Sequence, residues 1–381
     1  MTEPEQVSRS WTFLAPTGAR PSGGDIARFE LVNALARRGT DLVRVVHLPT
    51  PQAEARSPVD LPWFVFDGSV EHQFATDLDP DGVDDTDVVV YSTNLLSTAL
   101  PSDDPGSGRR LVDALQGGRA WLPVLFLQGH GVFRPIIEDL ALRLPGLKVC
   151  VGGWLVDLVV QTGVPRSEVV HIPNGLDHNR FRVRRPIDGR APRVAMNFDP
   201  YPAKRGRLGL AAIELLHDRR AVPATVFGTL PMERATDPDI GFLFSPSQET
   251  LAEVVYNEAS MFLQPSEREG FGMCAVEAMA CGCALVTTAN GGSADYAFDG
   301  ETALLCEGDA EQMAEVMDRL VRDDSLRVRI AMNGSRFVER FRWAASADRL
   351  ARLVSGRLAA TTGITAAERV NLDPVVRQLL S

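Results

Sequence analysis

Short apolar runs and helical patterns alternate from the start of the chain. An apolar run at residues 11–16 suits a buried strand, and a loop separates it from residues 25–38, where apolar side chains recur at helical spacing. Gly39 stands where a glycine commonly ends a helix, and a second apolar run covers residues 42–48. A strand, a helix and a strand in this order predict parallel pairing, and therefore an α/β fold.

The alternation continues along the chain in two sets. In the first set, further strands are predicted at residues 63–66, 88–91, 124–127, 149–151 and 169–172. A polar stretch with proline and glycine at residues 184–192 is interpreted as a domain linker. Beyond it, strands are predicted at residues 194–196, 224–227, 240–244, 261–264, 284–287 and 303–306, and helices at 208–217, 248–258, 273–280 and 310–322. The tail from Val338 onward has a helical, Arg-rich pattern.

Composition and charge limit the partners. Of the 381 residues, 45% are apolar and 23% charged, which is ordinary for a globular chain of two or three domains. The net charge of −11 opposes general binding to nucleic acid, and no such partner is expected. It also opposes strong docking on anionic lipid, although a local patch leaves peripheral membrane contact open. No apolar run reaches about 18 residues, so no transmembrane segment is predicted, and the polar start of the chain is unlike a secretory signal.

The cysteines and acidic residues do not predict a metal site. The odd number of cysteines and the absence of a C-x-x-C pair favour reduced thiols in a cytoplasm. Cys281 and Cys283 form a C-x-C pair, but no histidine lies near it in the sequence. The acidic residues 77–87 include D-x-D triplets, yet they precede a predicted strand rather than follow one, and we interpret them as a solvated loop.

The most informative stretch is residues 262–292, which has the pattern of a strand, a loop, a helix and a second strand. Glu269 is followed by Gly270, Phe271 and Gly272, and a helix is predicted to begin at Met273. Glycines let a backbone approach a ligand closely, and the free N–H groups of a helix start bind a phosphate-like anion. Glu269 at the helix mouth and Glu277 inside the helix would flank this anion. Because carboxylates repel phosphate, we expect them to bind hydroxyl groups of a sugar and a ribose.

Three simpler interpretations stay open for this stretch. Glu269 or Glu267 could only stabilise the helix start. Residues 270–275 also fit the dinucleotide fingerprint G-x-G-x-x-G/A, although Asp295 is poorly placed for the ribose contact which that motif needs. Glu277 could be an exposed surface residue.

The same stretch resembles the donor domain of the retaining glycosyltransferases of family 4, which have the GT-B fold. Their E-x7-E motif lies in a pattern close to PSxxEGFGxxxxEAMAxGxPVV, and this chain has PSEREGFG at residues 265–272, EAMA at 277–280 and GCALV at 282–286. The segment IPNGLD at 172–177, followed by Phe181, is similar to a segment that precedes the linker in that family. Residues 21–39 look like its first glycine loop and helix, so that Gly23 and Gly24 would contact the donor.

One family motif departs from the pattern. The family carries G-R-L, and then K-G a few residues later, with the Arg and Lys holding the donor diphosphate. Here Phe198 stands where the Arg would be, and either Lys204 or Arg205 would take the second cationic position. The competing interpretation is that both are solvated surface cations. The chain has only two lysines, Lys148 and Lys204, which favours a function for Lys204.

His130 follows the predicted strand 124–127. In a parallel sheet this places it at the carboxyl end of the strand, where ligand clefts form. Enzymes similar to this chain often have a histidine near the transferred sugar, and the competing interpretation is an ordinary hydrogen-bonded loop histidine. The other histidines show no shared ligand spacing.

The resemblance therefore implies an α/β protein of GT-B architecture. The expected domains are an acceptor-side Rossmann-like domain at residues 1–185, a donor domain at 186–345 and a helical tail at 346–381 that crosses back to the first domain, with a cleft between the two domains. We expect a bacterial, cytoplasmic, metal-independent transferase that moves a hexosyl or deoxyhexosyl group with retention of configuration. Glu269, His130 and Lys204 would be catalytic, and the donor would contact Gly23, Gly24, Lys204, Arg205, Glu269, Gly270, Phe271, Gly272, Met273 and Glu277.

The partners and the alternatives complete these expectations. The donor would be a nucleotide diphosphate sugar of unidentified base, with no further cofactor. The acceptor would be a glycan, a lipid-linked molecule or a small molecule. Two alternatives are a nucleotide-sugar epimerase of the same fold and a non-catalytic nucleotide-sugar binder, because one diphosphate-binding cation is replaced.

Overall fold

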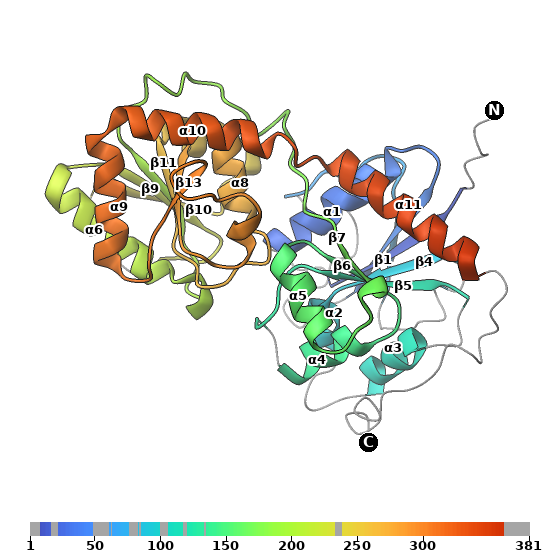
Figure 1. The fold of residues 1–381 in the computed structure, drawn as a ribbon. Helices are drawn as coiled ribbons and strands as arrows, with labels where there is room; N and C mark the ends of the chain where they lie inside the picture. Colours follow the sequence, from blue (N-terminus) through green and yellow to red (C-terminus); the bar gives the residue numbers. More distant parts are fainter. Residues whose placement is uncertain are drawn as a thin grey trace. The chain divides into compact units, whose positions relative to one another are not determined.

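The computed structural model divides the chain into two compact units (Figure 1). One unit comprises Met1–Gly175 and Trp343–Ser381, and the other comprises Leu176–Arg342. The structure describes residues 8–16, 22–48, 61, 63–75, 83, 85–99, 106–116, 120–132, 135–232 and 238–361. The boundary expected after residue 185 thus lies inside the second unit, and Trp343 onward returns to the first.

The first unit is built on a seven-stranded parallel sheet of order β3-β2-β1-β4-β5-β6-β7. Its strands are β1 Ser10–Pro16, β2 Leu42–Leu48, β3 Glu71–Phe74, β4 Val88–Tyr91, β5 Leu122–Leu127, β6 Leu147–Cys150 and β7 Val169–His171. Its helices are α1 Gly23–Ala36, α2 Thr93–Ala99, α3 Gly106–Gln116, α4 Pro135–Arg143, α5 Gly153–Gln161 and α11 Trp343–Thr361. Helix α11 packs against α1, so the end of the chain completes this unit.

The second unit has a six-stranded parallel sheet of order β10-β9-β8-β11-β12-β13. Its strands are β8 Val194–Asn197, β9 Ala224–Gly228, β10 Ile240–Phe244, β11 Met261–Gln264, β12 Ala284–Thr287 and β13 Ala303–Leu305. Its main helices are α6 Gly206–Arg220, α7 Gln248–Thr250, α8 Met273–Ala280, α9 Ala310–Arg322 and α10 Asp324–Val338, and a π-helix, η5, covers Leu251–Tyr256.

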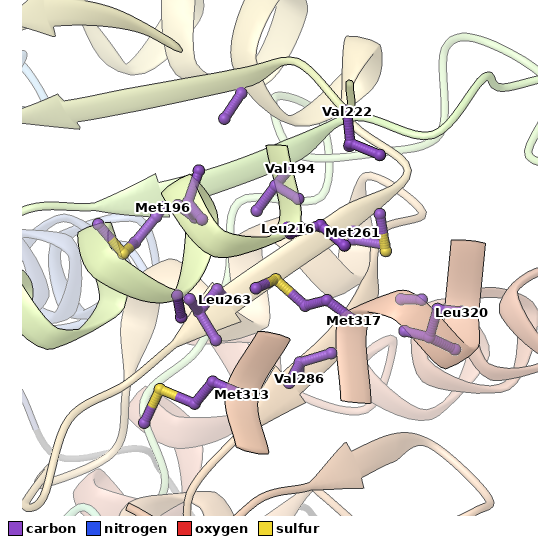
Figure 2. Close-up of a cluster of buried hydrophobic side chains, with 14 of the residues drawn as sticks. Val194, Met196, Leu216, Val222, Met261, Leu263, Val286, Met313, Met317 and Leu320 are labelled. Atoms are coloured by element: carbon purple, nitrogen blue, oxygen red, sulfur yellow. The ribbon is translucent and has the colours of Figure 1, made fainter. Parts of the chain in front are cut away.

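One face of the second sheet is buried by aliphatic side chains and methionines (Figure 2). Val194 and Met196 are two residues apart on β8, and Met261 and Leu263 are two apart on β11, so each pair lies on one face of the sheet. They pack against side chains of α6 and α9, such as Met317. Phe198, which replaces the expected Arg, is buried in the same cluster, so this position carries no cation.

One strand prediction is wrong. Residues 63–66 form no strand, and Glu71–Phe74 occupies the sheet edge instead. The amide of Asn33 on α1 donates to the carbonyl of Val65, at 2.9 Å, and its oxygen accepts from Asp67 N, at 2.8 Å. The aromatic rings of Phe64 and Phe66 pack on Phe29 of α1. The apolar run therefore reflects packing against a helix rather than strand pairing.

The remaining strand predictions are confirmed, apart from small shifts at their ends. Helices α2, α3, α4, α5 and α10 are additions to the prediction, and the helix predicted at residues 248–258 is a short α-helix followed by the π-helix. The helical tail expected from about Val338 onward corresponds to α11, Trp343–Thr361, and the rest of that expected tail, residues 362–381, lies outside the described residues. Most of the acidic loop at 77–87 lies outside the described residues.

Candidate functional site

The candidate site lies where the strand order of the second sheet reverses. Strands β8 and β11 are neighbours there, and the chain leaves them in opposite directions along the sheet, to β9 and to β12. Ligands of open α/β sheets bind beyond the carboxyl ends of the strands at such a point. Lys204 follows β8 and Glu269 follows β11, so the topology alone brings these two predicted residues together.

The carboxylate of Glu269 is held by three side chains. The ammonium of Lys204 lies 2.9 Å from Oε1 and 2.8 Å from Oε2. Gln264 Nε2 donates to Oε1 at 2.9 Å, and Ser266 Oγ donates to the same oxygen at 2.7 Å. Burial lowers the pKa of Lys204, but the charge and hydrogen bonds of Glu269 outweigh it, and the pKa is raised overall. Lys204 therefore stays an ammonium ion.

The loop after Glu269 needs glycine. Gly272 has a φ of 94°, and a Cβ there would lie 2.3 Å from the hydroxyl of Tyr296. Helix α8 begins directly after it, and no side chain in the described residues caps this helix start. The positive end of the helix is therefore left for an anion. Glu269 is only 8% exposed and bonded to neighbouring side chains, so it is not a solvated acidic residue at the helix start.

Glu277 points into the protein from α8. It is 6% exposed, and its Oε2 accepts a hydrogen bond from Tyr256 Oη at 3.0 Å. The interpretation of Glu277 as an exposed surface residue is therefore wrong. A carboxylate is kept in a buried position only with partners, which is typical of a binding group.

The two adjacent cations differ in their surroundings. Lys204 pairs with Glu269 inside the site, whereas the guanidinium of Arg205 lies 3.1 Å from the exposed carboxylate of Glu267 and packs against Gly308. Arg205 also has a left-handed backbone, with a φ of 51°, where it precedes α6. The geometry therefore favours Lys204 as the cation that would contact a diphosphate.

The predicted residues of the first unit follow β1 and β5. Gly23 and Gly24 begin α1, and a Cβ on Gly24 would lie 2.6 Å from Gln128 Oε1. His130 Nε2 lies 3.6 Å from Oε2 of the buried Glu138, and no hydrogen-bond partner for it is found in the described parts of the chain. The loop histidine is thus not held by an ordinary hydrogen bond at Nε2.

Three residues of the second unit's site were not predicted: Gln264, Ser266 and Tyr256. Gln264 ends β11, where a polar residue after three apolar ones points to a site at the strand's carboxyl end. Ser266 precedes Glu269 by three residues. Tyr256 had no comparable signal, because its contact with Glu277 depends on how η5 packs against α8.

Metal and membrane features were searched over the described residues. Within them, no three histidine, cysteine or acidic side chains form a group that could hold a metal ion. No helix there is long and apolar enough to cross a membrane.

Comparison with known proteins finds a family match within the second unit. Residues 234–337 match the family described as "Glycosyl transferases group 1". A curated relative, the D-inositol 3-phosphate glycosyltransferase of Corynebacterium efficiens, is 36% identical over 137 residues, which cover 35% of this chain and 32% of the relative. The match thus spans about a third of the relative's length.

Solved structures extend the similarity to the whole fold. Sucrose-phosphate synthase from Thermosynechococcus elongatus has a TM-score of 0.71 at 17% identity, covering 92% of this chain and all of that one. Anabaena Alr3699/HepE, solved in complex with UDP-glucose, has a TM-score of 0.67 at 17% identity, covering 91% of this chain and all of that one. The expected two-domain GT-B fold is therefore confirmed. The two alternatives, an epimerase and a non-catalytic binder, find no support in these comparisons.

Proposed function

We propose that the chain is a glycosyl transferase, because residues 234–337 match the group 1 family and the fold is GT-B, and that it transfers a sugar from a nucleotide diphosphate sugar to an acceptor hydroxyl. The observation that carries the proposal is the Lys204–Glu269 pair beside the uncapped start of α8. A cation and a helix start can bind the diphosphate, while a held carboxylate can accept hydrogen bonds from sugar hydroxyls. This combination suits a nucleotide sugar better than a free nucleotide.

The proposed mechanism depends on stabilising the negative charge that develops on the leaving diphosphate. As the bond between the sugar and the diphosphate breaks, the leaving group gains negative charge. Lys204 and the backbone N–H groups of Gly270–Met273 would stabilise it, at a position shaped before the reaction starts. Glu269 would hold the transferred sugar, and Glu277 would hold the ribose.

We further propose that transfer retains the anomeric configuration and requires no metal. Lys204 and the helix start would supply the positive charge that a metal provides to diphosphates in other transferases. The acceptor hydroxyl would attack on the face from which the diphosphate departs. The roles predicted from the sequence for His130, near the transferred sugar, and for the Gly23–Gly24 loop, as a donor contact, belong to the same proposal.

The first experiment is binding of UDP, GDP and dTDP, with and without magnesium, to the wild type and to Glu277→Ala by calorimetry. UDP leads this set because the structurally similar Anabaena protein was solved with UDP-glucose. We expect one nucleotide to bind without magnesium and the substitution to weaken it at least tenfold. If the folded protein binds none of the three, the proposed function is wrong.

The second experiment tests transfer itself. The wild type is incubated with the nucleotide sugar of the base identified above and a panel of glycan, lipid-linked and small-molecule acceptors. Formation of an α-linked product from an α-linked donor, read by NMR coupling constants, would demonstrate retention. A β-linked product would show that the proposed stereochemistry is wrong.

A further inference from the structure

The second unit contains a buried tyrosine, Tyr256, whose ring packing alone does not explain why the residue carries a hydroxyl. Tyr256 is fully buried, and its ring packs on Phe181, Phe227 and Phe262. A phenylalanine would fill the same space. The hydroxyl nevertheless points at Glu277, the carboxylate that we assign to the ribose.

The hydroxyl of Tyr256 faces the side chain of Glu277 on α8. Tyr256 Oη donates to Glu277 Oε2 at 3.0 Å, and Cys274 lies one helical turn before Glu277 on the same helix. Burial, and then the neighbouring Cys274 and Glu277, raise the pKa of Tyr256 well above its ordinary value. Burial likewise raises the pKa of the Cys274 thiol. Both groups therefore stay protonated, and Tyr256 remains a donor to the carboxylate.

An unusual backbone holds Tyr256 in this place. It is the last residue of the π-helix η5, a conformation that is rare and found frequently at functional sites. The next residue, Asn257, is fully buried, and its amide donates to Ala252 O at 2.7 Å and to Arg182 O at 3.0 Å. Its oxygen accepts from the backbone N–H of Arg184 at 2.7 Å.

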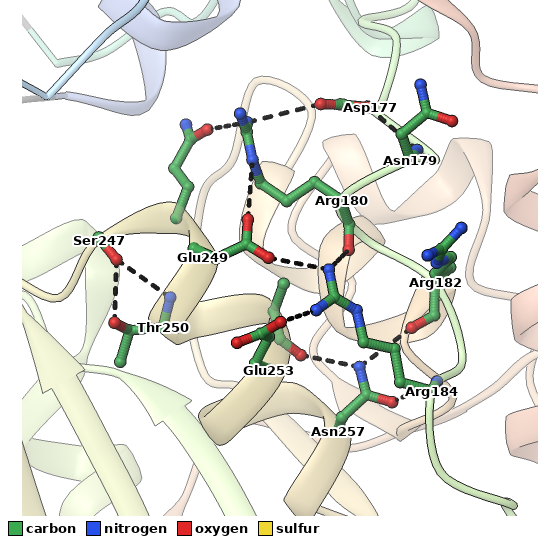
Figure 3. A network of polar contacts seen from close by, with 12 residues as sticks. Asp177, Asn179, Arg180, Arg182, Arg184, Ser247, Glu249, Thr250, Glu253 and Asn257 are labelled. Atoms are coloured by element: carbon green, nitrogen blue, oxygen red, sulfur yellow. Dashed lines mark hydrogen bonds and ion pairs between the residues drawn. The ribbon is translucent and has the colours of Figure 1, made fainter.

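Ion pairs also join residues 180–185 to the turns that precede Tyr256 (Figure 3). Arg184 pairs with Glu249 at 3.0 Å and with Glu253, and Arg180 lies 3.7 Å from Glu249. Residues 180–185 and the turns before Tyr256 are thereby fixed to each other. This network thus fixes the backbone that carries Tyr256.

We propose that Tyr256 is a positioning residue, which orients the Glu277 carboxylate for the ribose hydroxyls of the donor nucleotide. The proposal rests on the proposed function, since it needs a nucleotide at Glu277. It predicts that the loss of one hydroxyl changes recognition of the ribose without changing recognition of the diphosphate.

The test compares Tyr256→Phe with the wild type, using UDP and 2′,3′-dideoxy-UDP as probes, or the corresponding pair for the base that binds. A hydrogen bond to a charged group is worth enough for about a tenfold effect. We expect Tyr256→Phe to weaken UDP binding about tenfold and to leave dideoxy-UDP binding unchanged. The control is Tyr91→Phe, which removes the hydroxyl of another buried tyrosine and should alter neither affinity.

A double-mutant cycle separates positioning from a general structural effect. If Tyr256 acts through Glu277, then Tyr256→Phe should have no further effect on UDP affinity in a Glu277→Ala background. Equal weakening of both probes by Tyr256→Phe, or an unchanged UDP affinity, would overturn the proposal while leaving the proposed function in place. Failure of the folded wild type to bind any nucleotide would overturn both.

Discussion

The two units carry sheets of related order but treat the carboxyl ends of their strands differently. In each, the first strand lies between the next strand of the chain and the strand three places later, as β1 lies between β2 and β4, and β8 between β9 and β11. In the second unit, Glu269 is held by Lys204, Gln264 and Ser266. In the first, Gln128 Nε2 and His130 Nε2 have no hydrogen-bond partner in the described residues. The second unit thus holds its carboxylate with its own side chains, although Gln264 Oε1 has no partner among the described residues, whereas the first unit leaves two polar nitrogens that a ligand can satisfy.

The difference teaches that the sheet determines where a ligand binds, while the side chains decide what binds. A preorganised carboxylate and cation suit the proposed nucleotide sugar, and open polar atoms suit the proposed acceptor. The sequence also offers a way to observe the units separately, because all five tryptophans (Trp11, Trp63, Trp121, Trp154 and Trp343) belong to the first unit.

The largest effect is expected from removing Lys204, the cation that holds Glu269 in the second unit. Lys204→Ala should lower kcat/KM for transfer about 100- to 1000-fold, the usual cost of removing one group that stabilises a developing anion. Arg205→Ala is the matched control, since Arg205 pairs with Glu267 rather than Glu269, and we expect it to change kcat/KM less than about threefold. Steady-state kinetics on both variants decides between the two cations. A larger loss for Arg205→Ala would reverse the assignment.

The next effect concerns the loop of the same site. Gly272→Ala should reduce the free energy of unfolding by about 3 kcal/mol, because its left-handed φ strains an alanine and its Cβ would overlap Tyr296. Gly300→Ala separates the two causes: Gly300 also has a positive φ, of 72°, but nothing lies near a Cβ there, so about 1 kcal/mol is expected. Chemical denaturation followed by circular dichroism measures both. Similar losses for the two variants would mean that the overlap is relieved at no cost.

Lowering the pH should reduce the free energy of unfolding of the first unit, because this unit contains the buried His47. Burial, and then the neighbouring His72, lower the pKa of His47 to about 3, against an ordinary value of 6.5. The unfolded chain therefore binds this proton near pH 6.5 and the folded chain only near pH 3, so stability falls as the pH drops through that window. At pH 5 the loss from His47 is about 2 kcal/mol. Tryptophan fluorescence during denaturation at pH 7 and pH 5 reports it for the first unit.

The matched variant for this prediction is His47→Gln, which keeps a polar side chain beside His72 but does not titrate. Its stability should change less between pH 7 and pH 5 than that of the wild type. An identical pH dependence in both proteins would assign the acid sensitivity to other groups.

The sequence predicted much of the fold because apolar runs of parallel strands are distinct from their surroundings. Strands such as β4, Val88–Tyr91, are buried on both faces and show as continuous apolar segments. It failed at residues 63–66, where the aromatic side chains pack on Phe29 of α1 and the backbone of Val65 bonds to Asn33 instead of a strand. A short apolar run does not by itself reveal whether it packs on a helix or pairs with a strand.

The candidate site was predicted as far as its motif is contiguous. Glu269, the glycines and Glu277 lie within nine residues, and the strand–loop–helix pattern places them at one helix start. The pairing of Lys204 with Glu269 depends on β8 and β11 being neighbours, which only the sheet order reveals. The contact of Tyr256 with Glu277 depends on the π-helix η5, and so short a π-helix leaves no periodic pattern in the sequence.

The smallest expected effect tests the open site of the first unit. His130→Ala should lower kcat for transfer about tenfold, as expected for one lost hydrogen bond to the reacting groups, since 1.4 kcal/mol corresponds to a factor of ten. It should leave the affinity for the nucleoside diphosphate unchanged, because the diphosphate contacts assigned above lie in the second unit. The two units would then be separable by experiment: Glu277→Ala would affect nucleotide binding, and His130→Ala only the turnover. Loss of nucleotide affinity in His130→Ala would place this histidine on the donor and remove the functional distinction between the two sites.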